Sequence, residues 1–469
     1  MRRVLFTAIA SILIVSVVPA QAATTGGSAN VRHVTTLRYA TRYAQTLSFG
    51  TDIEFARIKG RDYAFAGTYR NGLQIIDVTN PRAPRIAAVY DCAIAQGDVQ
   101  VFRRGTRTLV AYAADDYSSH TFPESRCFRD NGLPSATYGT FFVDVTQPSR
   151  PRSAGFAEIP VGSHNQSVHP SGMYMYNSNA DLSPGGAIEV LDIRRLDQAV
   201  QVAELPLRTG LESHDITFSA DGKRAYSAAL THTLVLDTTK PGGPQVIGTI
   251  VDPTINLHHQ ADPITIDDPI LGERTFLIVT DELGGAAGNG SCPGGGLHVF
   301  DITGELERAP VKVGYWTIPD VSPAIDDWLV CTSHVLRLYP KQKLMTIGWY
   351  DAGVRIVDVS GLVGASVGAL PQIGNLGVGM REVGFYALPN ADTWSAKTNR
   401  FEKDGSFYLF GNDLNRGLDV YRYDSKAPKP SVTGVWMTPD EARAALPVQR
   451  LGSVPSFAPY CVVLPRLAS

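Results

Sequence analysis

Short apolar runs alternate with polar residues along most of the chain, and turns rich in Gly, Pro, Asp and Asn separate them. In LESHDITFSADGKRAYSAAL (211–230), Ile216 and Phe218 alternate with polar neighbours, residues 220–223 have turn chemistry, and a second apolar run follows. This pattern predicts a β-hairpin. Because no long segment has a 3.6-residue period, the sequence favours an all-β fold over an α/β fold.

A cassette recurs seven times: an apolar strand led mostly by Gly, then Asp (Arg422 in the seventh copy), a Thr/Pro-type turn and a second apolar strand. The copies are GLQIIDVTNPRAPRIAAVY (72–90), GTFFVDVTQPSRPRSAGFA (139–157), GAIEVLDIRRLDQAVQVAEL (186–205), HTLVLDTTKPGGPQVIGTI (232–250), GLHVFDITGELERAPVKVGYW (296–316), AGVRIVDVSGLVGASVGAL (352–370) and GLDVYRYDSKAPKPSVTGVW (417–436). A hairpin precedes each cassette, so one unit has four strands, A to D. Seven such units predict a seven-bladed β-propeller over residues 51–437.

The motifs LQIIDV, IEVLDI, HTLVLD and VRIVDV resemble those of the LVIVD-repeat family of secreted and surface propellers. The resemblance extends over nearly all of residues 50–437 and implies the propeller fold, but it implies almost nothing about function. The cassette Asp falls where strand C enters a turn, and its side chain can accept hydrogen bonds from the following backbone N–H groups. We therefore expect a structural role for Asp77, Asp144, Asp192, Asp237, Asp301 and Asp358.

The ends of the chain carry separate signals. Residues 1–22 have two arginines, an apolar stretch and an Ala-x-Ala site, which is typical of a secretory signal peptide and too short for a lasting anchor. We expect a secreted, periplasmic or cell-surface monomer without a membrane span. Residues 23–50 include VRHVTTLRYA (31–40), a strand that could pair with blade seven and close the ring. Residues 438–469 form a tail, which starts with a short helix candidate in MTPDEARAALP (437–447) and continues irregularly. The net charge of −3 gives no reason to expect nucleic acid as a partner.

Four of the five cysteines fall in predicted connections on one face of the propeller. Cys92 and Cys127 belong to blade two and the connection into it, and Cys292 and Cys331 belong to neighbouring blades. Because an exported protein meets oxidising conditions, we predict the disulfides 92–127 and 292–331. Cys461 is then left either as a free thiol or as a partner for a second chain.

Histidine recurs at the head of strand A, the strand that lines the channel. Aligning the hairpins on their turns places it there in four consecutive blades, at His164, His214, His259 (or His258) and His334. A structural explanation is that histidine tolerates half-burial at a channel mouth. Alternatively, neutral imidazoles that converge form a transition-metal site, and a set without thiolate suits copper or zinc best. The arrangement also resembles, more loosely, the histidine-lined copper site of the selenium-binding protein/methanethiol oxidase propellers.

Carboxylates predicted near these histidines are candidates for the chemistry. Asp98 takes the matching position in blade two, while blade one offers Thr51 or Asp52 and blade seven offers Arg381 or Glu382. The ends of strand B, on the same face, carry Asp115, Asp116, Asp181, Asp281, Glu282, Asp351 and Asp413. His120 and His232 are second-choice ligands on that face, whereas His169 and His298 are expected to be structural.

Two functions are consistent with this pattern. The first is a metal-dependent enzyme (oxidoreductase, hydrolase or lyase) with Glu282 or Asp98 as general base, because a carboxylate can take a proton from metal-bound water. Its pocket would open on the face of the long B-to-C loops. The second is a non-catalytic secreted binding or adhesion module, whose loop face holds a small molecule, a glycan or a protein.

Overall fold

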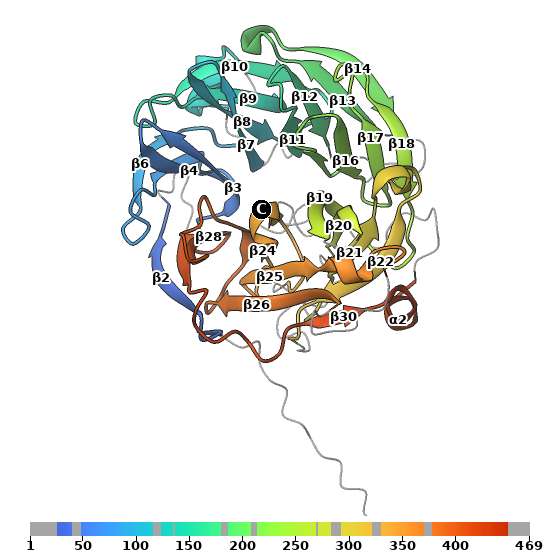
Figure 1. Cartoon of the computed structure of the whole chain (residues 1–469). Coiled ribbons are helices and arrows are strands. Elements are labelled where there is room, and N and C mark those ends of the chain that lie inside the picture. Colours follow the sequence, from blue (N-terminus) through green and yellow to red (C-terminus); the bar gives the residue numbers. More distant parts are fainter. Residues whose placement is uncertain are drawn as a thin grey trace, which may run out of the picture.

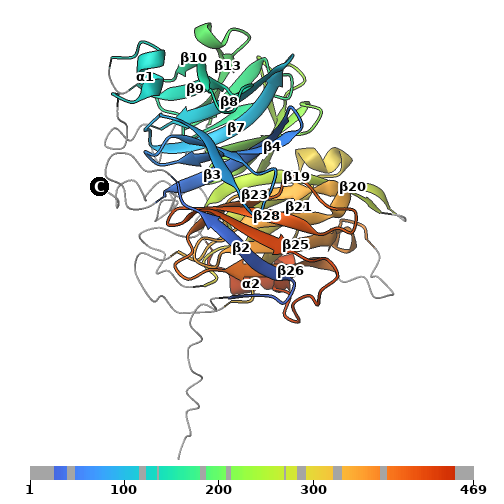
Figure 2. The same cartoon turned by 90° about the vertical axis from the view of Figure 1, so that its left-hand side faces the viewer.

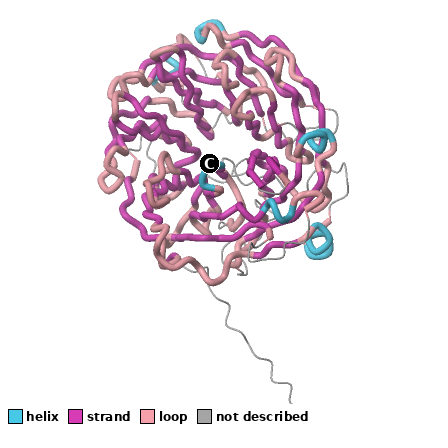
Figure 3. The backbone as a smooth tube through the Cα atoms, in the orientation of Figure 1, coloured by secondary structure: helices cyan, strands magenta, loops and turns pink. Residues whose placement is uncertain are grey.

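The structure is a computed structural model that describes residues 26–39, 48–115, 123–134, 137–179, 186–207, 213–268, 271–282, 292–320, 330–369 and 378–448. Seven antiparallel sheets in these ranges stand around a central axis (Figure 1). Strands make up most of the regular structure, and the helical turns are short (Figure 3). The predicted seven-bladed β-propeller is confirmed. The predicted signal peptide (1–22) and Cys461 lie outside the described residues.

The first four blades follow the chain in order, each with strand A innermost. They are β3 (Gly50–Ile58), β4 (Arg61–Thr68), β5 (Leu73–Asp77) and β6 (Arg85–Tyr90); β7 (Gln96–Arg104), β8 (Arg107–Ala114), β9 (Gly139–Asp144) and β10 (Arg152–Glu158); β11 (Asn165–Val168), β12 (Tyr174–Ser178), β13 (Ala187–Asp192) and β14 (Val200–Pro206); and β15 (Asp215–Phe218), β16 (Arg224–Ala228), β17 (Thr233–Asp237) and β18 (Gln245–Ile250).

The last three blades borrow strands from distant parts of the chain. Blade five has β19 (His258–Asp268), β20 (Gly272–Asp281), β21 (Leu297–Asp301), β22 (Val311–Thr317) and the added β30 (Val435–Met437). Blade six has β23 (Leu336–Tyr339), β24 (Leu344–Gly348), β25 (Val354–Gly361), β26 (Gly379–Ala387) and the added β1 (Gly26–Gly27). Blade seven has β27 (Thr393–Lys397), β28 (Phe407–Asp413), β29 (Gly417–Tyr423) and β2 (Val31–Leu37).

The outer strand of blade seven comes from the amino-terminal end of the chain and not from the seventh cassette. The amino-terminal strand β2 pairs antiparallel with β29 and is the outer strand of blade seven. In Figure 1 it lies outside β28, which belongs to the same blade. The expected outer strand of the seventh cassette, β30, instead pairs with β22 of blade five. The physical reason is Trp436, whose indole lies directly over Gly314 and Gly379, where any Cβ would collide with it.

Blade six differs from the prediction in a way that matters for the site. A 3₁₀ turn, η5 (Leu362–Ala365), follows β25, and the outer strand is β26 rather than the end of the cassette at 366–370. Arg381 and Glu382 therefore lie in an outer strand, and their expected place at the head of blade seven's strand A was wrong. That strand is β27, which places Trp394 and Lys397 beside the channel cavity.

The cassette aspartates make the expected Asx turns. In all six, one side-chain oxygen accepts a hydrogen bond from the backbone N–H two residues later, at 2.9–3.0 Å. An arginine pairs with each of them as well, for example Arg274 with Asp301 at 2.7 Å. The repeated Asp thus has a structural role at the end of strand C in six of the seven blades.

Both predicted disulfides are present, Cys92–Cys127 and Cys292–Cys331. The first fixes the helix α1 (Arg126–Asp130), which lies at the edge of the disc in the side view of Figure 2. The helix α2 (Pro439–Ala445) begins at a capping box formed by Thr438 and Glu441. Shorter 3₁₀ turns are η2 (Leu196–Gln198), η3 (Gly304–Arg308) and η4 (Pro340–Gln342). Among the described residues, no helix is long and apolar enough to cross a membrane.

Candidate metal centre

Four histidines from four consecutive blades form a continuous row at one end of the channel. His164, His214 and His334 immediately precede or flank their inner strands, and His259 is the second residue of β19. The centroids of successive rings are 4.5, 4.1 and 4.3 Å apart. All four side chains are buried, with residue exposures of 0–2%. The structure therefore brings together the four histidines singled out in the sequence, and it selects His259 rather than His258.

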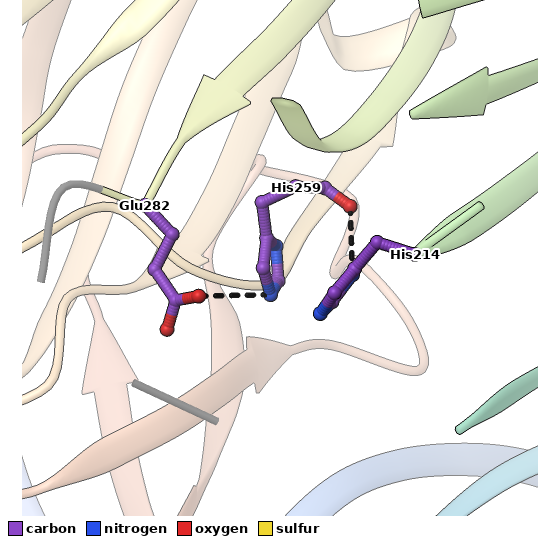
Figure 4. A group of neighbouring side chains, drawn as sticks. All are labelled: His214, His259 and Glu282. Carbon is purple, nitrogen blue, oxygen red and sulfur yellow. Dashed lines mark hydrogen bonds and ion pairs between the residues drawn. The ribbon is translucent and has the colours of Figure 1, made fainter. Parts of the chain in front are cut away.

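Three of these rings have one nitrogen committed to a fixed acceptor. Nδ1 of His164 lies 2.7 Å from Oδ2 of Asp115, which comes from the end of strand B in blade two. Nδ1 of His214 donates to the carbonyl of His259 at 3.0 Å (Figure 4), and Nδ1 of His334 donates to the carbonyl of Trp394 at 2.7 Å. Because carboxylate and carbonyl oxygens only accept, each neutral ring carries its proton on Nδ1 and a lone pair on Nε2.

The Nε2 atoms then face one another or a carboxylate. The Nε2 atoms of His164 and His214 are 3.0 Å apart, and the side-chain amide of Gln96 lies 3.3 Å from the former. Nε2 of His334 makes no hydrogen bond in the part of the chain that is described. Lone pairs placed this close repel each other unless a cation or a proton lies between them.

Glu282 completes the group from the end of β20. Its two oxygens lie 3.7 Å from Nε2 of His259 and 3.7 Å from Nε2 of His334. The hydroxyl of Tyr350 donates to Oε1 at 2.6 Å and orients the carboxylate. One ligand atom from each of His214, His259 and Glu282 lies within 4.8 Å of the others (Figure 4).

Burial sets the protonation of these rings. Desolvation holds the pKa of His214, His259 and His334 well below the usual value of histidine, and the neighbouring imidazoles lower the pKa of each ring further. The rings are therefore neutral at pH 7, and their lone pairs are available to an ion.

A cavity of about 350 Å³ extends from the histidines along the channel. Its lining includes Pro170 and Ala220 from exposed A-to-B turns, so it reaches the face opposite the long B-to-C loops. The expectation that the pocket opens on the B-to-C loop face does not fit this cavity. On that face a buried cluster of Phe49, Tyr69, Val330, Tyr350, Trp394 and Leu414 packs beside the channel.

The other residues named in the sequence fall elsewhere. Asp98 lines the cavity but does not contact the histidines, and its carboxylate accepts a hydrogen bond from Gln166 at 3.0 Å. His169 lies in an A-to-B turn, with Nε2 2.9 Å from the carbonyl of Gly222. His258 faces away from the row, with Nδ1 2.8 Å from the hydroxyl of Thr233.

His232 and His298 lie near His258 rather than in the row, and both are buried. His120, Asp116 and Asp181 lie outside the described residues. Sequence reasoning missed Lys397 and Arg337, which also line the cavity. Arg337 is the third residue after His334, and Lys397 is the third after Trp394. Lys397 was not identified because the inner strand of blade seven is expected from the sequence near Arg381 and Glu382.

The comparisons with known proteins identify no family and give a similarity among solved structures. No family model matches the chain, and no curated protein matches it. Among solved structures, the chain is similar to the β-propeller domain of Cps50 (Swd1) from Myceliophteria thermophila, with 10% sequence identity and a TM-score of 0.49. That similarity covers 84% of this chain and 100% of the other.

Proposed function

We propose that this chain is an exported, metal-dependent enzyme whose His164, His214, His259 and His334 hold a divalent transition metal, copper or zinc, with Glu282 beside it. The observation that carries the proposal is the orientation of the rings. Three of the four donate Nδ1–H to a carboxylate or carbonyl and present Nε2 to a shared space. Metal-binding histidines have this arrangement, because the second hydrogen bond fixes the tautomer and the ring plane.

The distances fit a metal centre. Two nitrogens 3.0 Å apart can both lie about 2.0–2.1 Å from one ion, the usual zinc–imidazole distance. The carboxylate of Glu282 lies 3.7 Å from Nε2 of His259 and of His334, so it could bind the same ion or take a proton beside it. Imidazole and carboxylate without thiolate suit zinc or copper.

The residues around the four histidines and Glu282 have different roles in the proposed hydrolase, lyase or oxidoreductase reaction. A bound ion would supply Lewis-acid or redox chemistry. Glu282, oriented by Tyr350, is the group placed to accept a proton there. Asp98 lies further along the cavity, so its part is to contact the ligand rather than the reacting centre. The buried cluster of described residues on the loop face would limit the access of water from that side.

Two further proposals concern identity and location. The amino-terminal pattern supports export of the chain, and both disulfides fit an oxidising compartment. The LVIVD-like motifs support membership of that repeat family.

Elemental analysis of the purified full chain tests the metal site. We expect about one copper or zinc per chain, lost in His214→Ala and retained in His169→Ala, whose ring lies in an A-to-B turn away from the row. Metal-free protein that cannot be loaded with either ion would refute the proposal. A ligand that binds independently of the four histidines would then favour the adhesion module.

A further inference from the structure

The cavity beside the histidines has an uneven distribution of charge. Five carboxyl groups and two cationic side chains line it: Asp52, Glu54, Asp98, Asp215, Asp262, Arg337 and Lys397. These groups come from the inner strands of six blades, so ionisable side chains line the channel around most of its circumference. The carboxyl groups outnumber these cations by five to two, so three of the carboxyl groups in the lining have no Lys or Arg of their own there.

Around the two cations the charges neutralise each other. Nζ of Lys397 lies 2.6 Å from Asp52 and 2.9 Å from Glu54, and the guanidinium of Arg337 pairs with Glu54. Because these two cations are shared by two carboxylates, this wall from blades one, six and seven is close to neutral.

The opposite side, which we name the acidic wall, consists of Asp98, Asp215 and Asp262 from blades two, four and five. None of the three forms an ion pair with a described residue. Asp98 accepts a hydrogen bond from Gln166 at 3.0 Å, and Asp262 accepts one from the hydroxyl of Thr217 at 2.6 Å.

Burial and neighbouring carboxylates make the acidic wall costly to ionise without a partner. Burial raises the pKa of Asp98 well above its usual value, and the charges of Asp52 and Asp215 raise it further. A bound cation would remove that cost, since an opposite charge within about 4–6 Å favours the ionised carboxylate.

A second feature, which a metal ion at the histidine row would also satisfy, marks this end of the cavity as a binding site. His334 lines it, is fully buried, and has an Nε2 without a hydrogen-bond partner among the described residues. A buried polar atom left unpaired is expensive, so it is normally satisfied by a ligand, an ion or water. The volume of about 350 Å³ lies at the small end of the range for ligand pockets.

We infer that the cavity binds a small organic cation, with its ammonium or guanidinium group against the acidic wall and its other end toward the histidine row. The orientation toward the histidines rests on the proposed function, whereas the binding of the cation does not. Asp262 follows His259 by three residues, which is roughly 10 Å along a strand at about 3.3 Å per residue. Because the ammonium group stops about 3 Å short of the carboxyl oxygen, the usual hydrogen-bond distance, a chain of about five carbon atoms covers most of the rest.

Calorimetric titration of the full chain with three probes of equal length, pentylamine, pentanol and pentanoate, tests the inference. At pH 7.5 we expect pentylamine to bind at least about tenfold more tightly than the other two. Asp98→Asn and Asp215→Asn should each weaken pentylamine binding about tenfold or more. Asp221→Asn, an exposed carboxylate at the A-to-B turn of blade four, is the matched control and should change nothing.

The outcomes separate this inference from the metal proposal. Amine binding that depends on Asp98 in metal-free protein supports the inference even if no metal is ever found. Pentanoate or pentanol binding as tightly as pentylamine overturns it, as does a Ca²⁺ or Mg²⁺ ion that occupies the wall while the amine does not bind. If Asp98→Asn fails to fold, Asp215→Asn and weaker amine binding at higher salt decide the question.

Discussion

Arg355 offers the sharpest test of how the fold tolerates charge in its interior. Its side chain is 1% exposed and lies in β25, where Nη1 is 2.7 Å from Asp320 and 3.2 Å from Glu382. Its Nε donates to the carbonyl of Ala352 at 3.1 Å. Glu382 is itself fully buried, so its carboxylate depends on this guanidinium. We expect Arg355→Met to be among the most destabilising single substitutions outside the hydrophobic core.

The magnitude follows from the partner left behind. Removing one member of a buried ion pair costs about 3–5 kcal/mol, because the remaining charge keeps its desolvation penalty. Burial already raises the pKa of Glu382 to about 7 while Arg355 opposes the rise. Without the arginine the pKa rises further, and Glu382 can escape the penalty by taking up a proton.

The sign of the pH dependence is therefore defined. A carboxyl group with a raised pKa in the folded state contributes stability that is present below its unfolded pKa, about 4.3, and lost as the pH rises through the folded value. In Arg355→Met that loss continues above pH 7, at about 1.4 kcal/mol per pH unit. We expect a cost of about 2 kcal/mol at pH 5 and 3–5 kcal/mol at pH 8.

Urea unfolding followed by tryptophan fluorescence at pH 5, 6.5 and 8, with the disulfides intact, measures this difference. Arg355→Met/Glu382→Gln should recover part of the loss at pH 8 and little at pH 5, because a neutral amide needs no cation. Arg381→Met is the matched control: it breaks the pair with Asp358 from a side chain 51% exposed and should cost no more than about 1 kcal/mol. A cost for Arg355→Met that does not change with pH would refute the reasoning.

Three further predictions concern the turns, the metal centre and a buried acid. Asp301→Ala should cost about 3 kcal/mol and Asp237→Ala about 1 kcal/mol in urea unfolding, because Asp301 is fully buried and also holds Arg274, whereas Asp237 is a third exposed. In metal titrations, His214→Ala and His334→Ala should each weaken binding at least about 100-fold, and the double variant should cost little more, since ligands of one ion act as a unit. Burial raises the pKa of Asp351 to about 7, so the stability that this group contributes to the wild type is lost as the pH rises through that value. Asp351→Asn should therefore have a higher melting temperature than the wild type at pH 8 but not at pH 5.

The fold was predictable because the cassette repeats a local rule. Six of the seven copies place an Asp where strand C enters its turn, and the alternation on either side sets which residues face the neighbouring blades. The errors fell where pairing is not local. The alternation in VTGVW (432–436) does not predict that this strand pairs with blade five. The pairing depends on Gly314 and Gly379, which leave room for the indole of Trp436.

The histidine row was predictable for the same reason, and its surroundings were not. Turn alignment fixes which residue begins each inner strand, so four histidines in register must meet near the axis. The atoms that orient them come from other segments: Trp394 and His259 contribute backbone carbonyls, which every residue has and no pattern reveals. Lys397 was hidden because the inner strand of blade seven had been assigned to Arg381 and Glu382.

The distribution of repeated and unrepeated residues indicates where function resides in this ring. The cassette Asp recurs in six of the seven blades and makes the same turn each time. A residue repeated in this way around the ring cannot give a ligand in the channel a preferred orientation. The inner strands break the symmetry. The histidine row comes from blades three to six. Among the described residues that line the cavity, Lys and Arg come from blades six and seven, and the carboxyl groups without an ion pair come from blades two, four and five. A ligand in the channel therefore meets a different chemistry on each side, and that asymmetry can hold it in one orientation.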